Sequence, residues 1–199
     1  MLKAVAFDAF GTLVKIFDKR YPYLSVARTS QNVPTISPMA KPIDLEQYAH
    51  LCQVTWQQTW DDDLASELDS ITTYSETIDV LSAVRAMGLK TAVASNLAQP
   101  YGKPIIDQLG TMLDVVCFSF ELGTVKPDPK FYEALCHKLD CKPSEILMVG
   151  DTWRCDYAGA TAAGLQALHL DRRGRANPER QPVSINDLNG VLSFVQSSS

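Results

Sequence analysis

The stretch KAVAFDAFGTL, at residues 3–13, decides the fold of this chain. Its apolar first half ends at Asp8, as expected for a short buried strand that delivers a polar side chain to the edge of a sheet. Similar apolar runs recur along the chain, with helical patterns between most of them, and this alternation is typical of parallel βαβ units. The strands that we expect cover residues 3–8, 90–95, 115–119, 146–151 and 165–170.

The connecting segments carry helix signals. Residues 76–87 have apolar residues at helical spacing, with Thr73 and Glu76 spaced as a capping box and Gly88 at the expected end. Asp128 and Pro129 are typical of a helix start. Further helices are expected over residues 100–109, 131–139 and 154–163.

Residues 15–72 interrupt this alternation. Four prolines between Tyr21 and Pro42 predict an extended loop, whereas apolar residues from Leu45 to Leu68 follow helical spacing, with Tyr48, Trp56 and Trp60 expected in a small core. A chain of 199 residues has room for one domain and an insertion. We therefore predict a core domain over 1–14 and 73–199 and a mostly helical cap over 15–72.

Composition narrows the function classes. The chain is 46% hydrophobic with a net charge of −5, which disfavours nucleic acid and anionic membrane surfaces as partners. The five cysteines are odd in number and read as reduced thiols, and no apolar run approaches the ~18 residues of a membrane span. We expect a cytoplasmic protein, monomeric or homodimeric, that binds a small molecule.

Polar residues lie at or after the carboxyl ends of the expected strands. Ligands bind at these ends in an open parallel sheet. These polar residues are Asp8, Ser95, Asn96, Lys126, Asp151 and Asp156. A rigid aspartate such as Asp8 can attack an anionic electrophile, and two aspartates can bind Mg²⁺ through oxygen. Lys126 would neutralise the oxygens of the transferring group, and Gly11 would let the backbone approach the substrate.

These residues, in the order DAFGTL (8–13), Ser95-Asn96, KPDP (126–129) and GDT (150–152) with Asp156, resemble the four motifs of the haloacid dehalogenase-like (HAD) hydrolase superfamily. The resemblance implies a Rossmann-like three-layer α/β core with a small first-position cap. It assigns catalytic roles to Asp8 as nucleophile and to Thr12, Lys126 and Asp156. It assigns substrate binding to Phe10, Gly11, Ser95, Asn96 and Lys126, and Mg²⁺ binding to Asp8, Asp151 and the backbone carbonyl of Phe10.

Phe10 departs from the pattern of the superfamily's phosphatases, which resemble D-x-D-G-T with a second aspartate as general acid. Phenylalanine carries no proton, and general acid-base catalysis is worth roughly 10² to 10⁴ in rate. The leaving group then needs little protonation, or water or a cap residue protonates it, or the reaction is not phosphate ester hydrolysis. An aromatic residue here resembles the 2-haloacid dehalogenases, as does Tyr132.

Asp151 favours a metal-dependent phosphatase over a dehalogenase. The dehalogenases use no metal, and their motif resembles one with Ser and Asn where this chain has Gly150 and Asp151. Their cap also places a carboxylate-binding arginine some thirty residues after the nucleophile, whereas the cap arginines here are Arg20 and Arg28. The leading hypothesis is a Mg²⁺-dependent phosphatase acting on a small phosphorylated metabolite through an aspartyl-phosphate. The alternatives are a metal-independent 2-haloacid dehalogenase with an aspartyl ester, and a catalytically weak binding or regulatory protein.

Other polar clusters have simpler interpretations. Residues 61–63 (Asp-Asp-Asp) and 172–175 (Arg-Arg-Gly-Arg) are expected to be solvated. His50, His137 and His169 receive no role.

Overall fold

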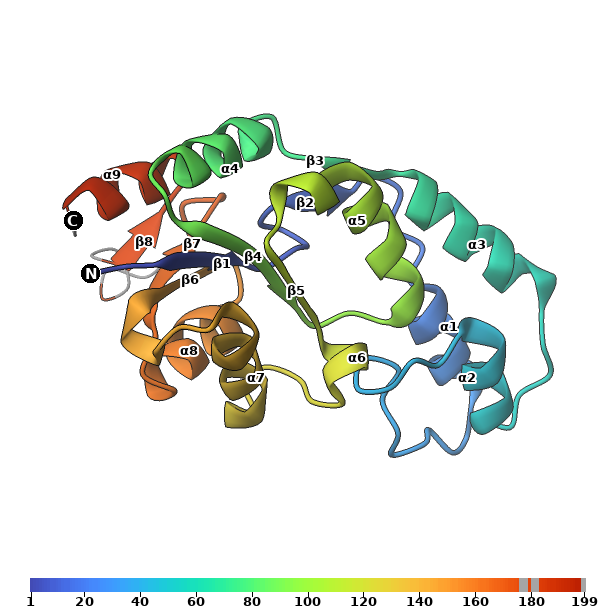
Figure 1. The fold of residues 1–199 in the computed structure, drawn as a ribbon. Helices are drawn as coiled ribbons and strands as arrows, with labels where there is room; N and C mark the ends of the chain where they lie inside the picture. The colour runs from blue at the N-terminus through green and yellow to red at the C-terminus, as the bar shows by residue number, and fades with distance from the viewer. Residues whose placement is uncertain (176–178, 180–182, 198–199) are drawn as a thin grey trace.

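The computed structural model describes residues 1–175, 179 and 183–197 and consists of a sheet-based core with a helical cap at one end (Figure 1). The α/β class expected from the sequence is confirmed. All five cysteines are free, and within the described ranges no helix is long and apolar enough to span a bilayer.

The core is a six-stranded sheet in the order β5-β4-β1-β6-β7-β8, and every neighbouring pair is parallel. Its strands are β1 (Ala4–Phe7), β4 (Lys90–Ser95), β5 (Val115–Phe118), β6 (Ile146–Gly150), β7 (Gln166–Leu170) and β8 (Ser184–Ile185). The five expected strands are present to within a residue at each end, and β8 is an addition. Because β1 lies between β4 and β6, Asp8 leaves the sheet near its centre.

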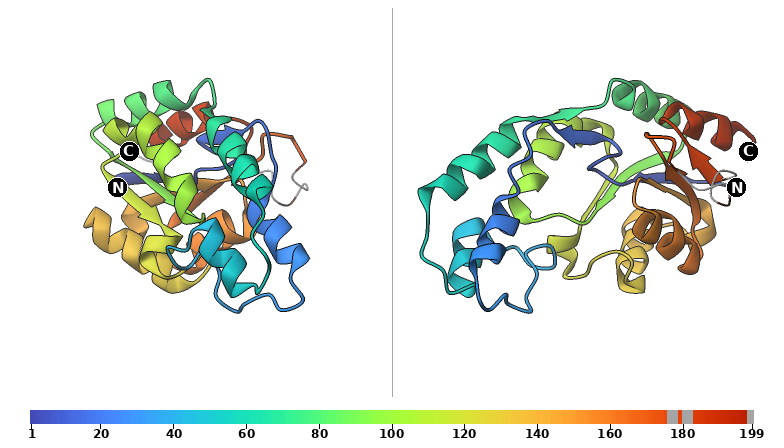
Figure 2. Two further views of the ribbon diagram at one scale, coloured as in Figure 1. Left: turned by 90° about the vertical axis from the view of Figure 1, so that its right-hand side faces the viewer. Right: turned by 180° about the vertical axis from the view of Figure 1, so that it is seen from behind.

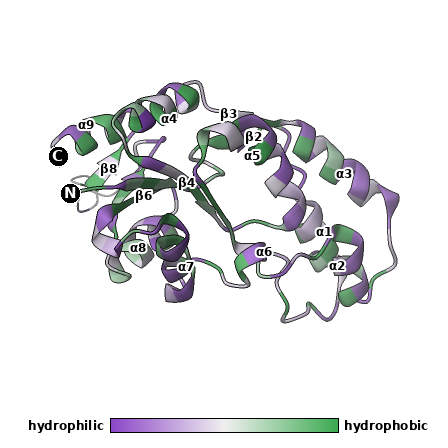
Figure 3. Cartoon of the chain, viewed as in Figure 1, coloured by the Kyte–Doolittle hydropathy of each residue, from purple (hydrophilic) through white to green (hydrophobic). Residues whose placement is uncertain are grey.

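Both faces of the sheet are covered by helices, which gives three layers (Figure 2). Side chains alternate along β1, so Val5 and Phe7 enter one core and Ala4 and Ala6 the other. The strands β4 and β6 are accordingly rich in hydrophobic residues (Figure 3). One face is covered by α4 (Thr77–Ala86), α5 (Gly102–Leu109) and α9 (Asn189–Ser197), and the other by α7 (Pro129–Leu139) and α8 (Ala160–Ala162).

Helix starts and stops agree only in part with the sequence signals. Asp128 caps α7 by accepting a hydrogen bond from the Lys130 amide, and Gly88 follows α4 with a φ of 78°, as expected. The capping box predicted for α4 is wrong. Glu76 is the N-cap residue and makes no side-chain cap bond, because its carboxylate binds Arg172 instead.

The cap is joined to the core by an antiparallel ribbon of β2 (Val14–Ile16) and β3 (Ile71–Thr73). It contains α1 (Pro22–Thr29), α2 (Leu45–Leu51) and α3 (Gln58–Asp69). The extended loop predicted from the prolines is therefore wrong over α1, where Pro22 occupies the first turn and is compatible with a helix. The helical pattern of the second half is divided at Gln53, whose φ of 56° ends the first helix.

The helices of the cap pack on a core of their own. Tyr48 and Trp60 are buried in it, and Trp56 contacts Trp60 edge-on with ring centroids 5.7 Å apart. This matches the prediction that these aromatic residues stabilise the cap.

Glu67 on α3 connects the cap to the core. Only 2% exposed, its carboxylate accepts hydrogen bonds from the amides of Arg20 (2.8 Å) and Tyr21 (2.9 Å) and from the hydroxyl of Tyr101. Tyr101 belongs to the core turn Gln99–Tyr101 that leads into α5. Because a buried carboxylate requires hydrogen-bond partners, Glu67 fixes how the entry to the cap lies against the core.

Arg172, at the end of β7, fastens the loop that follows β1. Its guanidinium donates to the carbonyl oxygens of Gly11 (3.1 Å) and Thr12 (2.7 Å) and to Glu76 Oε1 (2.7 Å). It also lies 3.6 Å from the centroid of the Tyr74 ring. The expectation that residues 172–175 are all solvated is therefore wrong for Arg172, whose side chain is 18% exposed.

We predict that Arg172→Met lowers the free energy of unfolding by about 2 kcal/mol, since several hydrogen bonds to a charged donor are lost together. Urea denaturation followed by circular dichroism measures this. Arg173→Met is the matched control, because Arg173 is exposed and should change stability by less than about 0.5 kcal/mol. Equal effects of the two substitutions would contradict the role given to Arg172.

The ion pair of Arg172 with Glu76 also predicts a pH dependence. Burial opposes ionisation of Glu76, but the hydrogen bond and charge of Arg172, together with backbone hydrogen bonds, outweigh it, so the pKa of Glu76 lies below its ordinary value of 4.5. A depressed carboxyl pKa stabilises the folded state above the unfolded pKa, and this contribution is lost as the pH falls. The stability difference between the natural protein and Glu76→Gln should therefore shrink below pH 4.5. A difference that stays constant with pH would count against the pair.

Candidate active site

The polar residues singled out in the sequence converge at the carboxyl ends of three neighbouring strands. Asp8 follows β1, Ser95 ends β4 and Asp151 follows β6. Lys126 reaches the same place from the loop that leads into α7, and Asp156 comes from the segment after β6. Parallel strands with polar ends produce this juxtaposition.

Lys126 is the centre of the site. Its ammonium group donates to Asp8 Oδ1 at 2.9 Å, to Asp156 Oδ1 at 2.6 Å and to the carbonyl oxygen of Ala94 at 2.6 Å. Lys126 is 3% exposed, and a buried charge is tolerated only with such partners. All three donor positions of the ammonium group are thus used within the protein.

Asp156 is held from a second side. Its Oδ2 accepts the Thr152 amide at 2.9 Å, while Oδ1 binds Lys126. The segment expected as an α-helix over 154–163 begins as the π-helix Trp153–Gly159, which carries Asp156 toward the strand ends. Gly150 is needed here, because a Cβ at this position would lie 2.3 Å from the Asp156 carboxyl group.

The three charges change one another's ionisation. Burial raises the pKa of Asp8 to about 6, with repulsion from Asp156 adding to the effect and Lys126 opposing it. Burial and the Asp8 charge also raise the pKa of Asp151. Burial disfavours the charged form of Lys126, but attraction to Asp8 and Asp156 exceeds it, so the pKa of Lys126 rises and the lysine stays protonated.

The two residues at the end of β4 do different things. Ser95 is 1% exposed, and hydrogen bonding from its side chain lowers the pKa of Asp8. Asn96 binds the Lys126 backbone twice, accepting from its amide and donating to its carbonyl, both at 2.8 Å. The side-chain amide of Asn96 thus positions Lys126, and the role in substrate binding that the resemblance implies for Asn96 stays a prediction.

Oxygen atoms gather on the open side of Asp8. One carboxylate oxygen from each of Asp8, Asp151 and Asp156 lies within 4.8 Å of the others. Gly11 makes room for this, because its φ is 84° and a Cβ there would lie 2.2 Å from Asp151 Oδ2. Phe10 lies two residues after Asp8 in the sequence. Its backbone carbonyl accepts no backbone hydrogen bond from the described loop residues.

Thr12, which the resemblance assigns a catalytic role, makes no side-chain hydrogen bond to another described residue. It is fully buried. Its backbone is nevertheless engaged, since the Thr12 amide donates to the Ala9 carbonyl at 3.2 Å and its carbonyl accepts from Arg172. Thr12 thus shapes the turn after Asp8 through its main chain.

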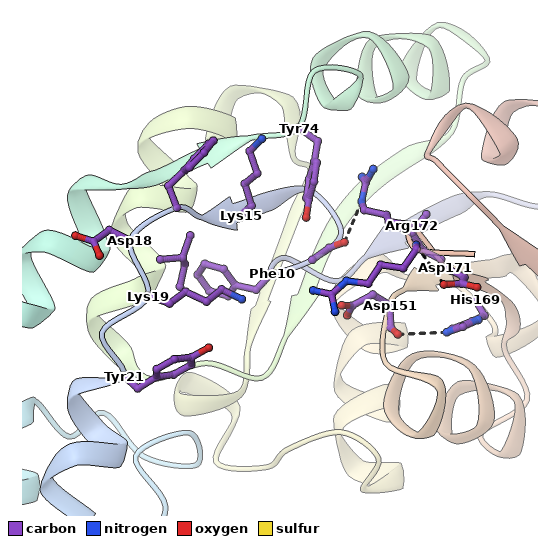
Figure 4. A pocket seen from close by; sticks show the side chains of 15 residues that line it. Phe10, Lys15, Asp18, Lys19, Tyr21, Tyr74, Asp151, His169, Asp171 and Arg172 are labelled. Atoms are coloured by element: carbon purple, nitrogen blue, oxygen red, sulfur yellow. Dashed lines mark hydrogen bonds between the residues drawn. The ribbon is translucent and has the colours of Figure 1, made fainter. Parts of the chain in front are cut away.

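A cavity of about 1010 Å³ opens between this cluster and the entry to the cap (Figure 4). Phe10, Gly11 and Asp151 form its inner wall, and Lys15 and Lys19 come from the entry to the cap. A second hollow of about 280 Å³ is mostly apolar and shares Phe10 and Lys19 with the first.

Several cavity residues had no predicted role. Arg172 could have been found by the rule that identified Asp8, because it also follows the carboxyl end of a strand. His169 contacts the backbone oxygen of Asp151 through Nε2 at 3.3 Å. Lys15, Lys19 and Tyr74 carry no sequence signal, since only the folding of the β2–β3 ribbon brings them to the cavity.

Comparisons with known proteins agree with this architecture. A family model described as haloacid dehalogenase-like hydrolase matches residues 2–164. The (S)-2-haloacid dehalogenase 1 of Pseudomonas sp. (strain CBS-3) is 31% identical over 57% of this chain and 53% of its own length. The glyceraldehyde 3-phosphate phosphatase of Methanopyrus kandleri is 36% identical over 51% of this chain and 44% of its own length. The chain thus spans about half the length of these relatives.

Solved structures match over nearly the whole chain. An HAD phosphatase from Thermococcus onnurineus superposes with a TM-score of 0.74 at 22% identity, covering 98% of both chains. The L-2-haloacid dehalogenase of Xanthobacter autotrophicus has a TM-score of 0.71 at 20% identity and covers 100% of both. At such identities these matches establish the fold and do not separate the two activities.

The family match over residues 2–164, together with motif residues that converge at the strand ends, leads to one conclusion. This chain belongs to the haloacid dehalogenase-like hydrolases.

Proposed function

We propose that this chain is a Mg²⁺-dependent phosphatase that acts on a small phosphorylated metabolite through an aspartyl-phosphate at Asp8. The observation that carries this proposal is the pairing of Asp8 with Asp151 on the open side of the Lys126 cluster. An aspartate at position 151 suits a metal ion, whereas metal-independent dehalogenation does not require a second acid at this position.

The residues present fit a hard cation. Asp156 has both oxygens engaged by Lys126 and Thr152, so the oxygens left for a metal belong to Asp8, Asp151 and the Phe10 carbonyl. Oxygen ligands of this kind suit Mg²⁺, which keeps several waters. Burial is the main cause of the raised pKa values of Asp8 and Asp151, and repulsion from a neighbouring carboxylate adds to it, so a cation would favour the ionised form of both acids. When bound, Mg²⁺ would neutralise phosphate oxygens and draw the substrate toward Asp8.

The chain's own residues would perform the two displacements. A carboxylate oxygen of Asp8 forms a bond to phosphorus, and the ester bond to the leaving alcohol breaks with its electron pair on oxygen. Water then adds to phosphorus, the bond to Asp8 breaks, and inorganic phosphate leaves as the Asp8 carboxylate is restored. Lys126 holds Asp8 in place and stays cationic, which favours the charge that accumulates on the phosphoryl oxygens.

Phe10 shapes how the leaving group departs. Its ring contacts Tyr101 edge-on with centroids 5.8 Å apart and occupies the position where the related phosphatases have their acid. The leaving oxygen therefore takes its proton from water in the wide cavity or leaves without one. Substrates with acidic leaving groups are favoured by such a site.

2-Haloacid dehalogenation is the second candidate. Phe10 favours it, as does the 31% identity to a dehalogenase. Two observations weigh against it. Arg20 binds Asp18 and Asp63, and it does not line the cavity. Tyr132, which resembles a dehalogenase residue, donates its hydroxyl to the carbonyl of Cys155, so this hydroxyl already has a partner within the protein. A catalytically weak binding protein is the third candidate, motivated by the missing acid at Phe10.

Assays of phosphate and halide release separate these functions. We expect phosphate release from 4-nitrophenyl phosphate in the presence of Mg²⁺, abolished by EDTA and restored by excess Mg²⁺. Halide release from 2-chloropropionate should stay at background with and without metal. Halide release that persists in EDTA would overturn the phosphatase proposal in favour of dehalogenation.

Asp8→Asn should reduce turnover by roughly 10³-fold or more, since an amide is a poor nucleophile. The substitution keeps the shape of the side chain, and circular dichroism checks that the variant folds. Asp61→Asn is the matched control, because Asp61 is exposed on α3. Turnover that survives in Asp8→Asn would show that another residue is the nucleophile.

Phe10→Asp should raise the turnover of an alkyl phosphate by ~10² while changing that of 4-nitrophenyl phosphate much less, since only the poor leaving group needs a proton. Phe10→Asn removes the same ring but donates no acidic proton and serves as the control. Equal gains in both variants would mean that removal of the ring, and not acid catalysis, is responsible.

A further inference from the structure

The smaller of the two spaces beside the active site, the apolar hollow of about 280 Å³, lies on the side of β4. It is lined by residues 96–98, which directly follow the end of β4, the neighbour of β1 in the sheet. The larger cavity instead includes Asp151 and the end of β7. Both spaces include Phe10, Lys19 and Tyr21, and Figure 4 shows the last two at the end of the larger cavity nearer the cap. The hollow therefore meets the larger cavity at Phe10.

Apolar residues of the cap form much of the wall of this hollow. Tyr21, Leu24 and Met39 line it and are 55%, 44% and 46% exposed. Leu24 lies on α1, and Met39 lies in the loop between α1 and α2. Large apolar side chains that are open to water and gathered around one space are typical of a binding surface. Because the hollow is continuous with the cavity that contains Asp151, we expect part of the substrate to cover these side chains.

The polar side chains that line this hollow and not the larger cavity already have partners. Glu67 accepts hydrogen bonds from two backbone amides and from the Tyr101 hydroxyl. The hydroxyl of Tyr23 donates to a backbone carbonyl at 3.1 Å, and Asn96 binds the backbone of Lys126. The hollow therefore presents rings and hydrocarbon to a ligand. A substrate portion rich in hydroxyl groups would lose its water there without gaining equivalent hydrogen bonds.

Several of the lining side chains are aromatic. Phe10 meets Tyr101 edge-on with ring centroids 5.8 Å apart, and Tyr23 lies 6.4 Å from Tyr101. All three rings line the hollow. Aromatic side chains attract a further ring through edge-to-face and offset stacked contacts. An apolar cavity of ~150 Å³ is enough to hold benzene. The hollow, at about 280 Å³, therefore has room for one aromatic ring with a small substituent.

The absence of an acid at Phe10 favours the same kind of leaving group. Without a proton donor at this position, the ester oxygen departs with its electron pair and is protonated by water. A phenol, with a pKa of about 10, gives a far more stable anion than an alkyl alcohol and departs more readily. The missing acid and the rings of Tyr23 and Tyr101 are separate features of the chain, and a phenolic leaving group suits both.

We propose that the substrate is a small aryl phosphate whose aromatic ring binds in this hollow, between residues 96–98 of the core and Leu24 and Met39 of the cap. This inference rests on the proposed phosphatase function, because it takes Asp8 as the place where the phosphate binds. As a carboxylate oxygen of Asp8 forms its bond to phosphorus, the ester bond breaks with its electron pair on the phenolate oxygen. The phenolate then takes a proton from water.

Direct binding tests the hollow without turnover. Three non-hydrolysable phosphonates differ only in the tail: ethylphosphonate, cyclohexylmethylphosphonate and benzylphosphonate. Isothermal titration calorimetry on the intact protein with Mg²⁺ should show about tenfold tighter binding of benzylphosphonate than of ethylphosphonate, since the added ring carbons leave water. Benzylphosphonate should also bind about two- to tenfold more tightly than cyclohexylmethylphosphonate, because aromatic contacts contribute beyond the buried area.

Polar substitutions in the cap wall locate the effect. In Leu24→Gln and Met39→Gln, the ratio of affinities for benzylphosphonate over ethylphosphonate should fall several-fold. Ile36→Gln is the matched control, because Ile36 lies in the same loop as Met39, is 37% exposed and lines neither space. The ratio in this variant should equal that of the natural protein.

The outcomes separate the aromatic subsite from the phosphatase proposal. Equal affinity for the three phosphonates, no binding of any of them, or a preference that survives both Gln substitutions in the cap wall would overturn the subsite. Cyclohexylmethylphosphonate that binds as tightly as benzylphosphonate would overturn its aromatic character. Phosphate release from 4-nitrophenyl phosphate that depends on Mg²⁺ would still support the proposed function in each case. A preference for benzylphosphonate in a protein that releases no phosphate would support the subsite and overturn the catalytic proposal.

Discussion

The buried ammonium group of Lys126 is the interaction on which the site depends. A lysine that is 3% exposed is stable as a cation only if its donors are satisfied, and Asp8, Asp156 and the Ala94 carbonyl satisfy them. Each partner comes from a different strand end or from the segment after one. The sheet therefore has to bring these ends together for the charge to be buried, which links the fold to the chemistry.

Other features follow from this arrangement. Asn96 clamps the backbone on both sides of Lys126, so the lysine approaches from a fixed direction. Gly150 leaves the space that the Asp156 carboxyl group occupies, and a larger residue there would displace it. Arg172 fixes the carbonyls of Gly11 and Thr12, the loop that follows Asp8. The active end of the sheet is thus held by polar contacts, whereas the helices and strands behind it pack through apolar side chains.

The sheet and the location of the site were accessible from sequence because both depend on local patterns. Apolar runs with a polar final residue predict strand ends, and parallel strands bring such ends together. Contacts between distant segments were not accessible in this way. Glu76 has the spacing of a capping residue, yet it binds Arg172, which lies 96 positions further along the chain. The resemblance assigns Thr12 a catalytic role, and its hydroxyl lacks a partner among the described residues.

The sequence by itself determined which functional residue follows each predicted strand. An acid follows the first strand, a lysine the third, and two more acids the fourth. Motif residues of this kind act through identity and position along the chain, and both are visible in the sequence. Only the tertiary structure decided which charges are neutralised. Arg20 is paired at the surface of the cap, while Lys15 and Lys19 line the cavity and have no carboxylate within 4.0 Å among the described residues. That outcome depends on how the β2–β3 ribbon sets the cap against the sheet, and pairing across such distances leaves no local pattern.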